Sequence, residues 1–466
     1  MTPYAVLVTI LAYFGAIALV SALAGRKKDG QQVFYTGGRN THWAVVAFAM
    51  IGSCMSGVTF VSVPGMVGTS GFGYLQMCIG FFLGYLVIAF ALTPLYFKLE
   101  VVSIYQYLEK RFGLGAYETG AWFFFLSKML GASVRLFLVC LTLQLLLFGP
   151  LGLPFWLNVV CNVGICLVYT YRSGVKSVIW TDVLKTLCMI VAVTLCVVLI
   201  GKDLGGIRIH EKVFFFDDVN HPQFFWKQLL GGLFTVIAMT GLDQDMMQRT
   251  LACKDHRDSQ KNLIVSSLLQ TVVIALFLCL GALLYQFAAL HGIPETGDRL
   301  FPTVATSGLL PAVVGVLFVL GLVSSAYGAG GSALTSLTTS FTVDILHKAG
   351  EVKVRKAVHL AMAALMVVTI VVFNALNSTS AIDAVYKLGS YTYGPILGLF
   401  AFGILTKKQV KDRYVPIVAI LAPLICLVLQ LNSERWFGGY KFSYELLLLN
   451  AALTFLGLCL LIRRKQ

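Results

Sequence analysis

The chain has 466 residues, of which 58% are hydrophobic and only 12% are charged, and its mean hydropathy is +0.84. Soluble globular domains carry about 25% charged residues, so this composition excludes an ordinary soluble globule and indicates a polytopic membrane protein. The formal net charge of +14 does not indicate a nucleic-acid partner, because most basic residues lie in short loops between apolar runs and not on one soluble face.

The first apolar run, residues 4–25, is expected to be an uncleaved membrane span with the amino terminus outside. It lacks a basic segment before the apolar residues, and its charges follow the run at 26–28. Ten of the eleven cysteines fall inside apolar runs, and Cys253 lies at the edge of one. We therefore expect the cysteines to be small packing residues and not a disulfide framework.

A hydrocarbon core about 30 Å thick needs about 20 apolar residues per helix. By that criterion the sequence predicts thirteen spans, near 4–25, 43–65, 72–97, 117–148, 154–172, 178–201, 227–250, 262–288, 311–345, 357–376, 381–405, 414–432 and 442–462. Basic loops then alternate onto one side, at 26–28, 98–113, 171–176, 254–261, 347–356, 407–413 and 463–465. The positive-inside rule makes that side cytoplasmic and places the carboxyl terminus there. The short loops favour a bacterial inner (plasma) membrane.

Spans two to six and spans seven to eleven form two groups of five, and an odd number of spans inverts the second group relative to the first. The predicted fold is therefore all-α, a single transmembrane transporter domain with a five-plus-five inverted-repeat core at 43–405 and additional helices at 1–42 and 406–466. The glycine-containing segments GSCMSG at 52–57, GG at 231–232 and TG at 240–241 are candidates for breaks in the first helix of each group. Close packing of glycine is the alternative explanation for each.

Three stretches of sequence carry a family resemblance. They are MSGVTFVSVPG (55–65) with FKLEVVSIYQYLEKRF (97–112), GVKSVIWTDVLK (174–185), and GLDQDMMQRTLA (241–252) with SALTSLTTSFTVDI (332–345). In this order and spacing the chain resembles the sodium/solute symporter family, and the first stretch resembles its iodide/multivitamin and sialic acid branch. The resemblance implies alternating access around a site at the membrane midplane, with sodium driving uptake.

The resemblance also implies a common sodium site. Backbone carbonyls of the broken helix map to Gly52 and Met55, and a small residue on span nine maps to Ser325. Neutral oxygens suit a hard cation, and an unwound helix provides them without added charge. The hydroxyl pair of that site maps to Gly328 and Ala329, so both hydroxyls are missing here.

A second sodium site of some family members maps to Asp182 and Ser332. Lys185 stands where members usually have glutamine, three residues after Asp182, so the two side chains are expected to meet on one helix face. One interpretation is a structural pair of buried charges. The other is that Lys185 fills the space beside Gly328 and stands in for sodium, which makes transport proton-coupled or sodium-independent.

Arg135 lies near the middle of span four, and Lys128 lies two turns earlier on the same face. A guanidinium at the midplane seldom faces lipid, and its fork of donors suits a carboxylate. An arginine held by backbone carbonyls or by a nearby acid is the alternative. The resemblance implies an arginine against the substrate carboxylate, with hydroxyls from the broken helix, here Ser56 and Thr59. The prediction is a small anionic solute, such as a carboxylated sugar like sialic acid.

Two further substrate-binding candidates follow the broken helix. Tyr74 is placed to stack on a solute, and Gln76 lies near the position where the sialic acid transporters carry glutamine and this chain has Cys78. Most membrane aromatics are packing or interface residues, which is the alternative for Tyr74.

Residues 243–249 carry the DQxxxQR signature at the expected cytoplasmic end of span seven. Asp243, Gln244, Gln248 and Arg249 suit a polar gate network, and a structural network at a helix end is an equal alternative.

An enzyme is not expected, because the chain has no HExxH, G-x-S-x-G or P-loop motif. The histidines lack metal-ligand spacing, so no cofactor is predicted beyond Na+ as a possible coupling ion. The expected partners are the small solute and the lipid bilayer, with no obligate protein partner indicated. A non-transporting solute sensor on the same fold is the alternative from another functional class.

Overall fold

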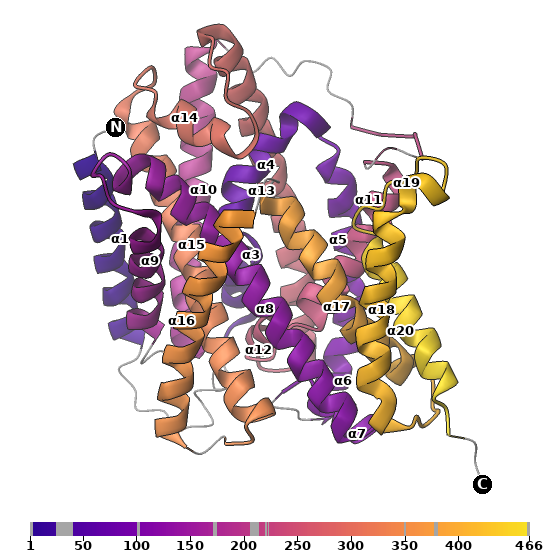
Figure 1. Cartoon of the computed structure of the whole chain (residues 1–466). Coiled ribbons are helices and arrows are strands. Elements are labelled where there is room, and N and C mark those ends of the chain that lie inside the picture. The colour runs from indigo at the N-terminus through magenta and orange to yellow at the C-terminus, as the bar shows by residue number, and fades with distance from the viewer. Residues whose placement is uncertain are drawn as a thin grey trace.

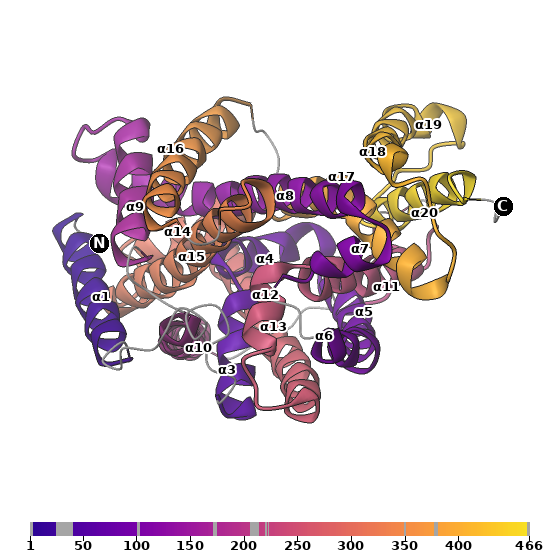
Figure 2. The same ribbon diagram turned by 90° about the horizontal axis from the view of Figure 1, so that it is seen from below.

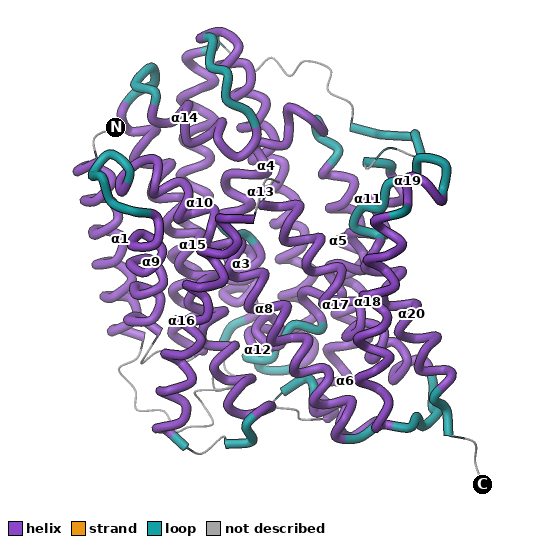
Figure 3. The backbone as a smooth tube through the Cα atoms, in the orientation of Figure 1, coloured by secondary structure: helices purple, strands orange, loops and turns teal. Residues whose placement is uncertain are grey.

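The computed structural model describes residues 3–24, 41–99, 103–170, 175–205, 214–219, 221, 223–348, 351–376 and 381–463. Regular structure in these ranges is helical, apart from two isolated bridges that join Thr41 to Cys253 and Val410 to Ile462 (Figure 3). Long apolar runs form helices because lipid offers no hydrogen bonds to the backbone, which must pair its own polar groups. The predicted all-α membrane fold is confirmed, and all eleven cysteines are free thiols.

The first half of the chain contains α1 (Pro3–Ala24), α3 (Trp43–Cys54), α4 (Gly57–Ser70), α5 (Tyr74–Val87) with η2 (Ile88–Leu92) and α6 (Thr93–Leu99), α7 (Gln106–Arg111), α8 (Leu114–Leu143) with η3 (Gln144–Phe148), α9 (Phe155–Thr170) and α10 (Val175–Asp203). The second half contains α11 (Phe225–Val236) with η4 (Ile237–Gly241), α12 (Gln244–Thr250), α13 (His256–His291), η5 (Gly297–Arg299), α14 (Leu300–Thr306), α15 (Ala312–Ser340) with η6 (Phe341–Ile345), α16 (Val352–Leu376), α17 (Ala381–Leu405), η7 (Asp412–Tyr414), α18 (Val415–Leu431), α19 (Ser433–Trp436) and α20 (Leu446–Leu460).

Within the described ranges, eight helices are long and apolar enough to cross a membrane, and two bent helix pairs raise this number to ten. The other three predicted spans, near 4–25, 154–172 and 442–462, coincide with α1, α9 and α20, whose apolar stretches Tyr4–Ala16, Phe155–Val168 and Leu446–Leu460 are only 10–17 residues long. Length alone therefore does not confirm the count of thirteen, although each predicted span coincides with a helix or a bent pair.

The first bent pair consists of α3 and α4, whose axes differ by 62°. The chain is extended at Met55 and Ser56, inside the segment 52–57 where the glycines predict a break. The last carbonyls of α3 and the first N–H groups of α4 consequently have no partners within their helices.

The second bent pair joins α11 and η4 to α12 with an angle of 75°. The break lies at Leu242 and Asp243, directly after the glycine at 241. Gly231 and Gly232 lie inside the unbroken α11, and a Cβ at Gly232 would overlap the carbonyl oxygen of Met77 on α5. This glycine pair is therefore a close-packing feature, and only the later glycine marks a break.

The helices are arranged so that α1 lies at one side of the bundle and α18 and α20 lie at the opposite side, in both views (Figures 1 and 2). Between them, α10 packs against α3 and α15, while α8 packs against α15 and α17. The two breaks lie on the first helix of each predicted group of five. The division of the chain into 1–42, 43–405 and 406–466 stays a prediction.

Candidate functional site

A small polar cavity lies within the bundle, next to α3 and α12 of the two bent pairs. Its lining comes from α3, α8, α10, α12 and α15 and consists of Ser53, Lys128, Arg135, Asp182, Lys185, Asp245, Met246, Arg249, Gly328, Ala329 and Ser332. Eight residues that the sequence analysis singles out therefore meet in one place, namely Lys128, Arg135, Asp182, Lys185, Arg249, Gly328, Ala329 and Ser332. We use the name ionic cluster for the charged residues of this lining together with Asp243, which pairs with Lys128: Lys128, Arg135, Asp182, Lys185, Asp243, Asp245 and Arg249.

The Lys128 ammonium anchors one side of the ionic cluster. Its Nζ lies 3.1 Å from Oδ2 of Asp243 and 3.0 Å from Oδ2 of Asp245. Asp243 also caps α12 by accepting a hydrogen bond from the Met246 N–H at 3.1 Å, and it accepts another from the Tyr393 hydroxyl at 2.7 Å. Asp243 is only 2% exposed, so its charge is compensated within the protein and not by water.

Arg249 connects its own helix, α12, to α10 and α15. Its Nε lies 3.1 Å from Oδ2 of Asp182, and its Nη1 lies 3.3 Å from Oδ2 of Asp245. Nη2 donates a short hydrogen bond to the Ser332 hydroxyl, which itself donates to Oδ1 of Asp245 at 2.7 Å. Ser53 donates to Oδ2 of Asp182 at 2.9 Å. One guanidinium therefore bridges α10, α12 and α15.

The direct pair of Asp182 and Lys185 expected from their spacing is not formed. Asp182 pairs with Arg249, while the fully buried Lys185 Nζ makes no hydrogen bond to any described residue. A Cβ built on Gly328 would lie 2.7 Å from Cδ and 3.3 Å from Nζ of Lys185. Lys185 thus occupies the space that a side chain at position 328 would need, because α10 and α15 pack closely there.

Arg135 is half-buried and lines the same cavity. Its guanidinium forms no ion pair or hydrogen bond with the described residues. Among these residues, neither an acid nor a backbone carbonyl, the two alternatives to a substrate role, therefore holds Arg135. The ionic cluster holds four cations (Lys128, Arg135, Lys185 and Arg249) and three carboxylates (Asp182, Asp243 and Asp245), which leaves one positive charge in excess.

The candidate sodium residues of the common site lie around the first break. Gly52 packs against α10 so closely that a Cβ would overlap Oγ1 of Thr186. Met55 is buried at the extended break itself. The Ser325 hydroxyl donates to the Leu322 carbonyl at 2.8 Å and lies 3.6 Å from the Cβ position of Gly57, just after the break. The role of these residues as sodium ligands stays a prediction.

The substrate candidates Ser56 and Thr59 lie on the far side of the break. Ser56 is the N-cap residue of α4, but its hydroxyl does not bond the helix, and Thr59 follows in the first turn. Neither residue lines the small cavity of the ionic cluster. Their hydroxyls make no hydrogen bonds to described residues, so they stay available to a ligand.

The other two substrate candidates have protein partners. The Tyr74 hydroxyl lies 2.7 Å from the Tyr386 hydroxyl, which links α5 to α17. The fully buried Gln76 donates from Nε2 to the carbonyls of Gly73 and Gln223, both at 3.2 Å. Gln76 therefore anchors the segment before α11, with its Oε1 left without a hydrogen bond in the described part of the chain.

Gln244, the second gate candidate, connects α12 to the segment that precedes α7. Its Oε1 accepts a hydrogen bond from the Ile104 N–H at 2.8 Å. A contact that crosses from a helix break to a short interhelical segment suits either a gate or a structural link, so the gate role stays a prediction.

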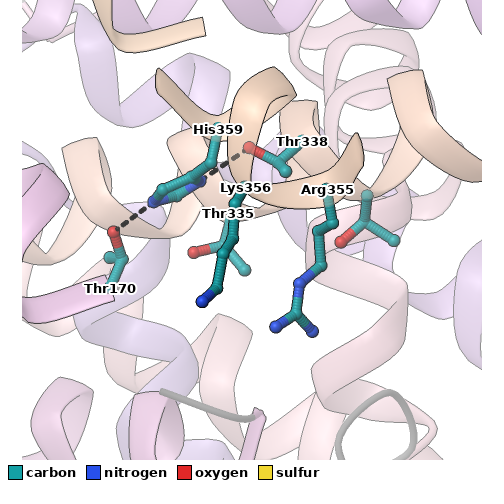
Figure 4. A pocket seen from close by; sticks show the side chains of 7 residues that line it. Thr170, Thr335, Thr338, Arg355, Lys356 and His359 are labelled. Carbon is teal, nitrogen blue, oxygen red and sulfur yellow. Dashed lines mark hydrogen bonds between the residues drawn. The ribbon is translucent and has the colours of Figure 1, made fainter. Parts of the chain in front are cut away.

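A second polar pocket was not predicted from the sequence. It lies between α9, α15 and α16 and is lined by Thr170, Thr335, Thr338, Thr339, Arg355, Lys356 and His359 (Figure 4). His359 is 6% exposed; its Nδ1 lies 2.7 Å from the Thr338 hydroxyl and its Nε2 lies 3.1 Å from the Thr170 hydroxyl. Sequence reasoning missed it because the three segments are far apart in the chain and a lone histidine on a helix carries no motif.

Comparison with known proteins identifies relatives that match most of this chain. The chain is 26% identical to the sodium/sialic acid symporter NanT of Aliivibrio fischeri, over 93% of this chain and 89% of that protein. It is 25% identical to the sodium/sialic acid symporter SiaT of Proteus mirabilis, over 90% and 88%. It is 24% identical to the human sodium/iodide cotransporter, over 86% and 65%.

Solved structures share the fold. A substrate-bound, outward-open Na+-coupled sialic acid symporter superposes with a TM-score of 0.82 at 19% identity and covers 98% of this chain and 97% of its own. The nucleobase-cation-symport-1 family transporter Mhp1 superposes with a TM-score of 0.59 at 14% identity, over 90% and 92%. The sequence model of the sodium:solute symporter family matches residues 34–413, well over half of the chain. This protein therefore belongs to the sodium:solute symporter family and is a membrane transporter and not an enzyme.

Proposed function

We propose that this protein imports a small organic anion, with a carboxylate as the group recognised and sialic acid as the first solute to test. The observation that carries the proposal is Arg135, a half-buried guanidinium that has no ion-pair partner among the described residues and lies beside an ionic cluster with one excess positive charge. A charge withdrawn from water without a partner is unfavourable, so a carboxylate that binds at Arg135 would supply a counter-charge there. Two similar proteins are sodium/sialic acid symporters, which supports the choice of solute.

The coupling ion of the family is sodium, and the proposed position for it is the first break. Carbonyls of Gly52 and Met55 and the hydroxyl of Ser325 offer neutral oxygens there. Ser56 and Thr59 begin the helix on the other side of the same break and would contact the solute. Binding of ion and solute at one break would favour the same closed arrangement of the helices, which couples the two fluxes.

The experiment is uptake of labelled sialic acid into proteoliposomes under a sodium gradient, a proton gradient or neither, in competition with other carboxylates and neutral sugars. Carboxylates should compete and neutral sugars should not. Arg135→Gln should raise the half-saturating solute concentration at least tenfold, about 1.4 kcal/mol of lost binding, while Arg135→Lys should keep part of the affinity. Unchanged affinity in Arg135→Gln would remove the anchor role. Binding without flux would identify a sensor instead.

A second candidate is a sodium-independent or proton-coupled carrier, which the position of Lys185 favours. The buried ammonium stands beside Gly328, where the common sodium site of the family has a hydroxyl. In this case Lys185→Gln should create sodium stimulation or abolish stimulation by a proton gradient. If Lys185→Gln uptake keeps the parent's dependence on both gradients, this candidate is wrong.

We also propose a bacterial inner membrane as the location, with the amino terminus outside and the carboxyl terminus in the cytoplasm. The alternation of the basic loops supports this orientation. Alkaline phosphatase fused after residue 466 should be inactive, while the same enzyme fused in the segment 206–213 should be active. The reverse pattern would overturn the orientation.

A further inference from the structure

Arg249 holds both residues that the family resemblance assigns to a second sodium ion. Its Nε lies 3.1 Å from Oδ2 of Asp182, and its Nη2 donates to the Ser332 hydroxyl. Arg249, Asp182 and Ser332 are 2%, 1% and 5% exposed, so water does not compete for these contacts. Oδ2 of Asp182 and the Ser332 hydroxyl, two of the oxygens that would surround an ion between α10 and α15, are thus already in contact with a positively charged group, while the buried Oδ1 of Asp182 makes no hydrogen bond to a described residue.

The contacts of Arg249 make its displacement by a sodium ion unfavourable. A guanidinium offers five donors in a plane, and here it reaches two carboxylates and one hydroxyl on three helices. Asp245 is held a second time by Lys128, at 3.0 Å. A sodium ion between Asp182 and Ser332 would lie next to the guanidinium, and in a buried site the repulsion between like charges is strong.

We infer that Arg249 is the resident cation of the Asp182–Ser332 position and that this position takes no sodium ion. Asp182 and Ser332 then bind the Arg249 guanidinium and are not ligands of an ion. Through these contacts Arg249 connects α12 to α10 and α15. Each transport cycle can therefore use at most the sodium ion of the first break. The inference is independent of the identity of the solute.

The same geometry predicts a gain of sodium binding when Arg249 is removed. Without it, the ionic cluster would contain three cations and three carboxylates, and the only hydrogen-bond donor left to Asp182 among the described residues would be Ser53. The vacated space would be lined by the oxygens of Asp182, Asp245 and Ser332. Carboxylate and hydroxyl oxygens suit a hard cation, so Arg249→Gln should turn this position into a sodium site.

The test measures the melting temperature of the purified full-length protein in sodium chloride and in choline chloride at equal ionic strength. Arg249→Gln should show a sodium-specific rise in melting temperature larger than any that the parent shows from the first break, and Arg249→Gln with Asp182→Asn should lose the added rise again. Arg249→Lys keeps a cation in place and should show no gain. A folded Arg249→Gln protein without any gain would overturn the inference.

Ser332→Ala provides an independent measurement in the parent, because it removes one hydroxyl and leaves every charge in place. The sodium concentration that gives the half-maximal response should stay within twofold of the parent, and a parent without any response also agrees with the inference. A rise of tenfold or more in Ser332→Ala would make Ser332 a sodium ligand and would overturn it, even if Arg249→Gln fails to fold. Because this readout does not involve uptake, a failure here is distinguishable from a failure of the proposed solute.

Discussion

Lys128 on α8 and Asp243 at the start of α12 are joined by an ion pair with 3.1 Å between Nζ and Oδ2, in a part of the protein where neither residue is more than 6% exposed. The same ammonium also pairs with Asp245, so one cation contacts two carboxylates at the break of the second bent helix pair. The break therefore depends on a charge supplied by another helix.

Lys128→Met should destabilise the protein strongly, because it removes the ammonium that pairs with the buried Asp243 and leaves Asp245 with Arg249 alone. Breaking a buried ion pair from one side costs about 3–5 kcal/mol. Lys261→Met is the matched control, since Lys261 is exposed and its pair with Asp258 is worth about 0–1 kcal/mol. Thermal unfolding of the purified proteins checks the difference, and equal melting temperatures for the two variants would contradict it.

Tyr393→Phe should weaken the same network in a milder way. The Tyr393 hydroxyl donates to Oδ2 of Asp243 at 2.7 Å, and a hydrogen bond to a charged group contributes about 1.5–3 kcal/mol. Tyr414→Phe, at an exposed tyrosine, should have no measurable effect. In combination with Lys128→Met the loss should be non-additive, because both partners act on one carboxylate. Strict additivity would show that they act separately.

Gly328→Ala should be destabilising because the new methyl group would lie 2.7 Å from Cδ of Lys185. Overpacking of this kind costs about 1–3 kcal/mol. Shortening the opposing side chain with Lys185→Ala should relieve the clash, so that the double variant loses less than the sum of the single ones. Gly131→Ala is the control, since nothing lies within 4 Å of its Cβ position. A Gly328→Ala protein as stable as Gly131→Ala would contradict the placement of Lys185.

Gly232→Ala tests the packing role of the glycine pair on α11. Its Cβ would overlap a backbone carbonyl of α5, at Met77, which cannot rotate away as a flexible side chain can. The two helices would have to separate, with a loss of about 1–3 kcal/mol. Gly164→Ala on α9 has open space around it and should not lose stability. If both variants unfold at the parent's temperature, α5 and α11 are less closely packed than described.

Much of the architecture could be predicted from the sequence, because lipid forces each long apolar run into a helix that pairs its own backbone. The positions of the helices and the break at 52–57 follow from apolar length and from glycines in a short segment. The sequence offered two positions for the break in span seven, at 231–232 and at 240–241. In the structure the helix breaks directly after the glycine at 241, whereas Gly232 packs against α5. Apolar length and composition could not distinguish these two uses of glycine.

The amino-acid sequence by itself determined that the chain is an all-helical membrane transporter, and it identified Asp182, Lys185 and Arg135 as unusual charges in apolar helices. The tertiary structure alone decided the surroundings of these charges: Asp182 pairs with Arg249, Lys185 lies beside Gly328, and Arg135 has no counter-charge in the part of the chain that the structure describes. The physical reason is that the spacing along one helix gives the face on which a charge lies, whereas buried charges pair across helices. Those helices, α8, α10, α12 and α15, are far apart in the chain and meet only when the bundle is packed.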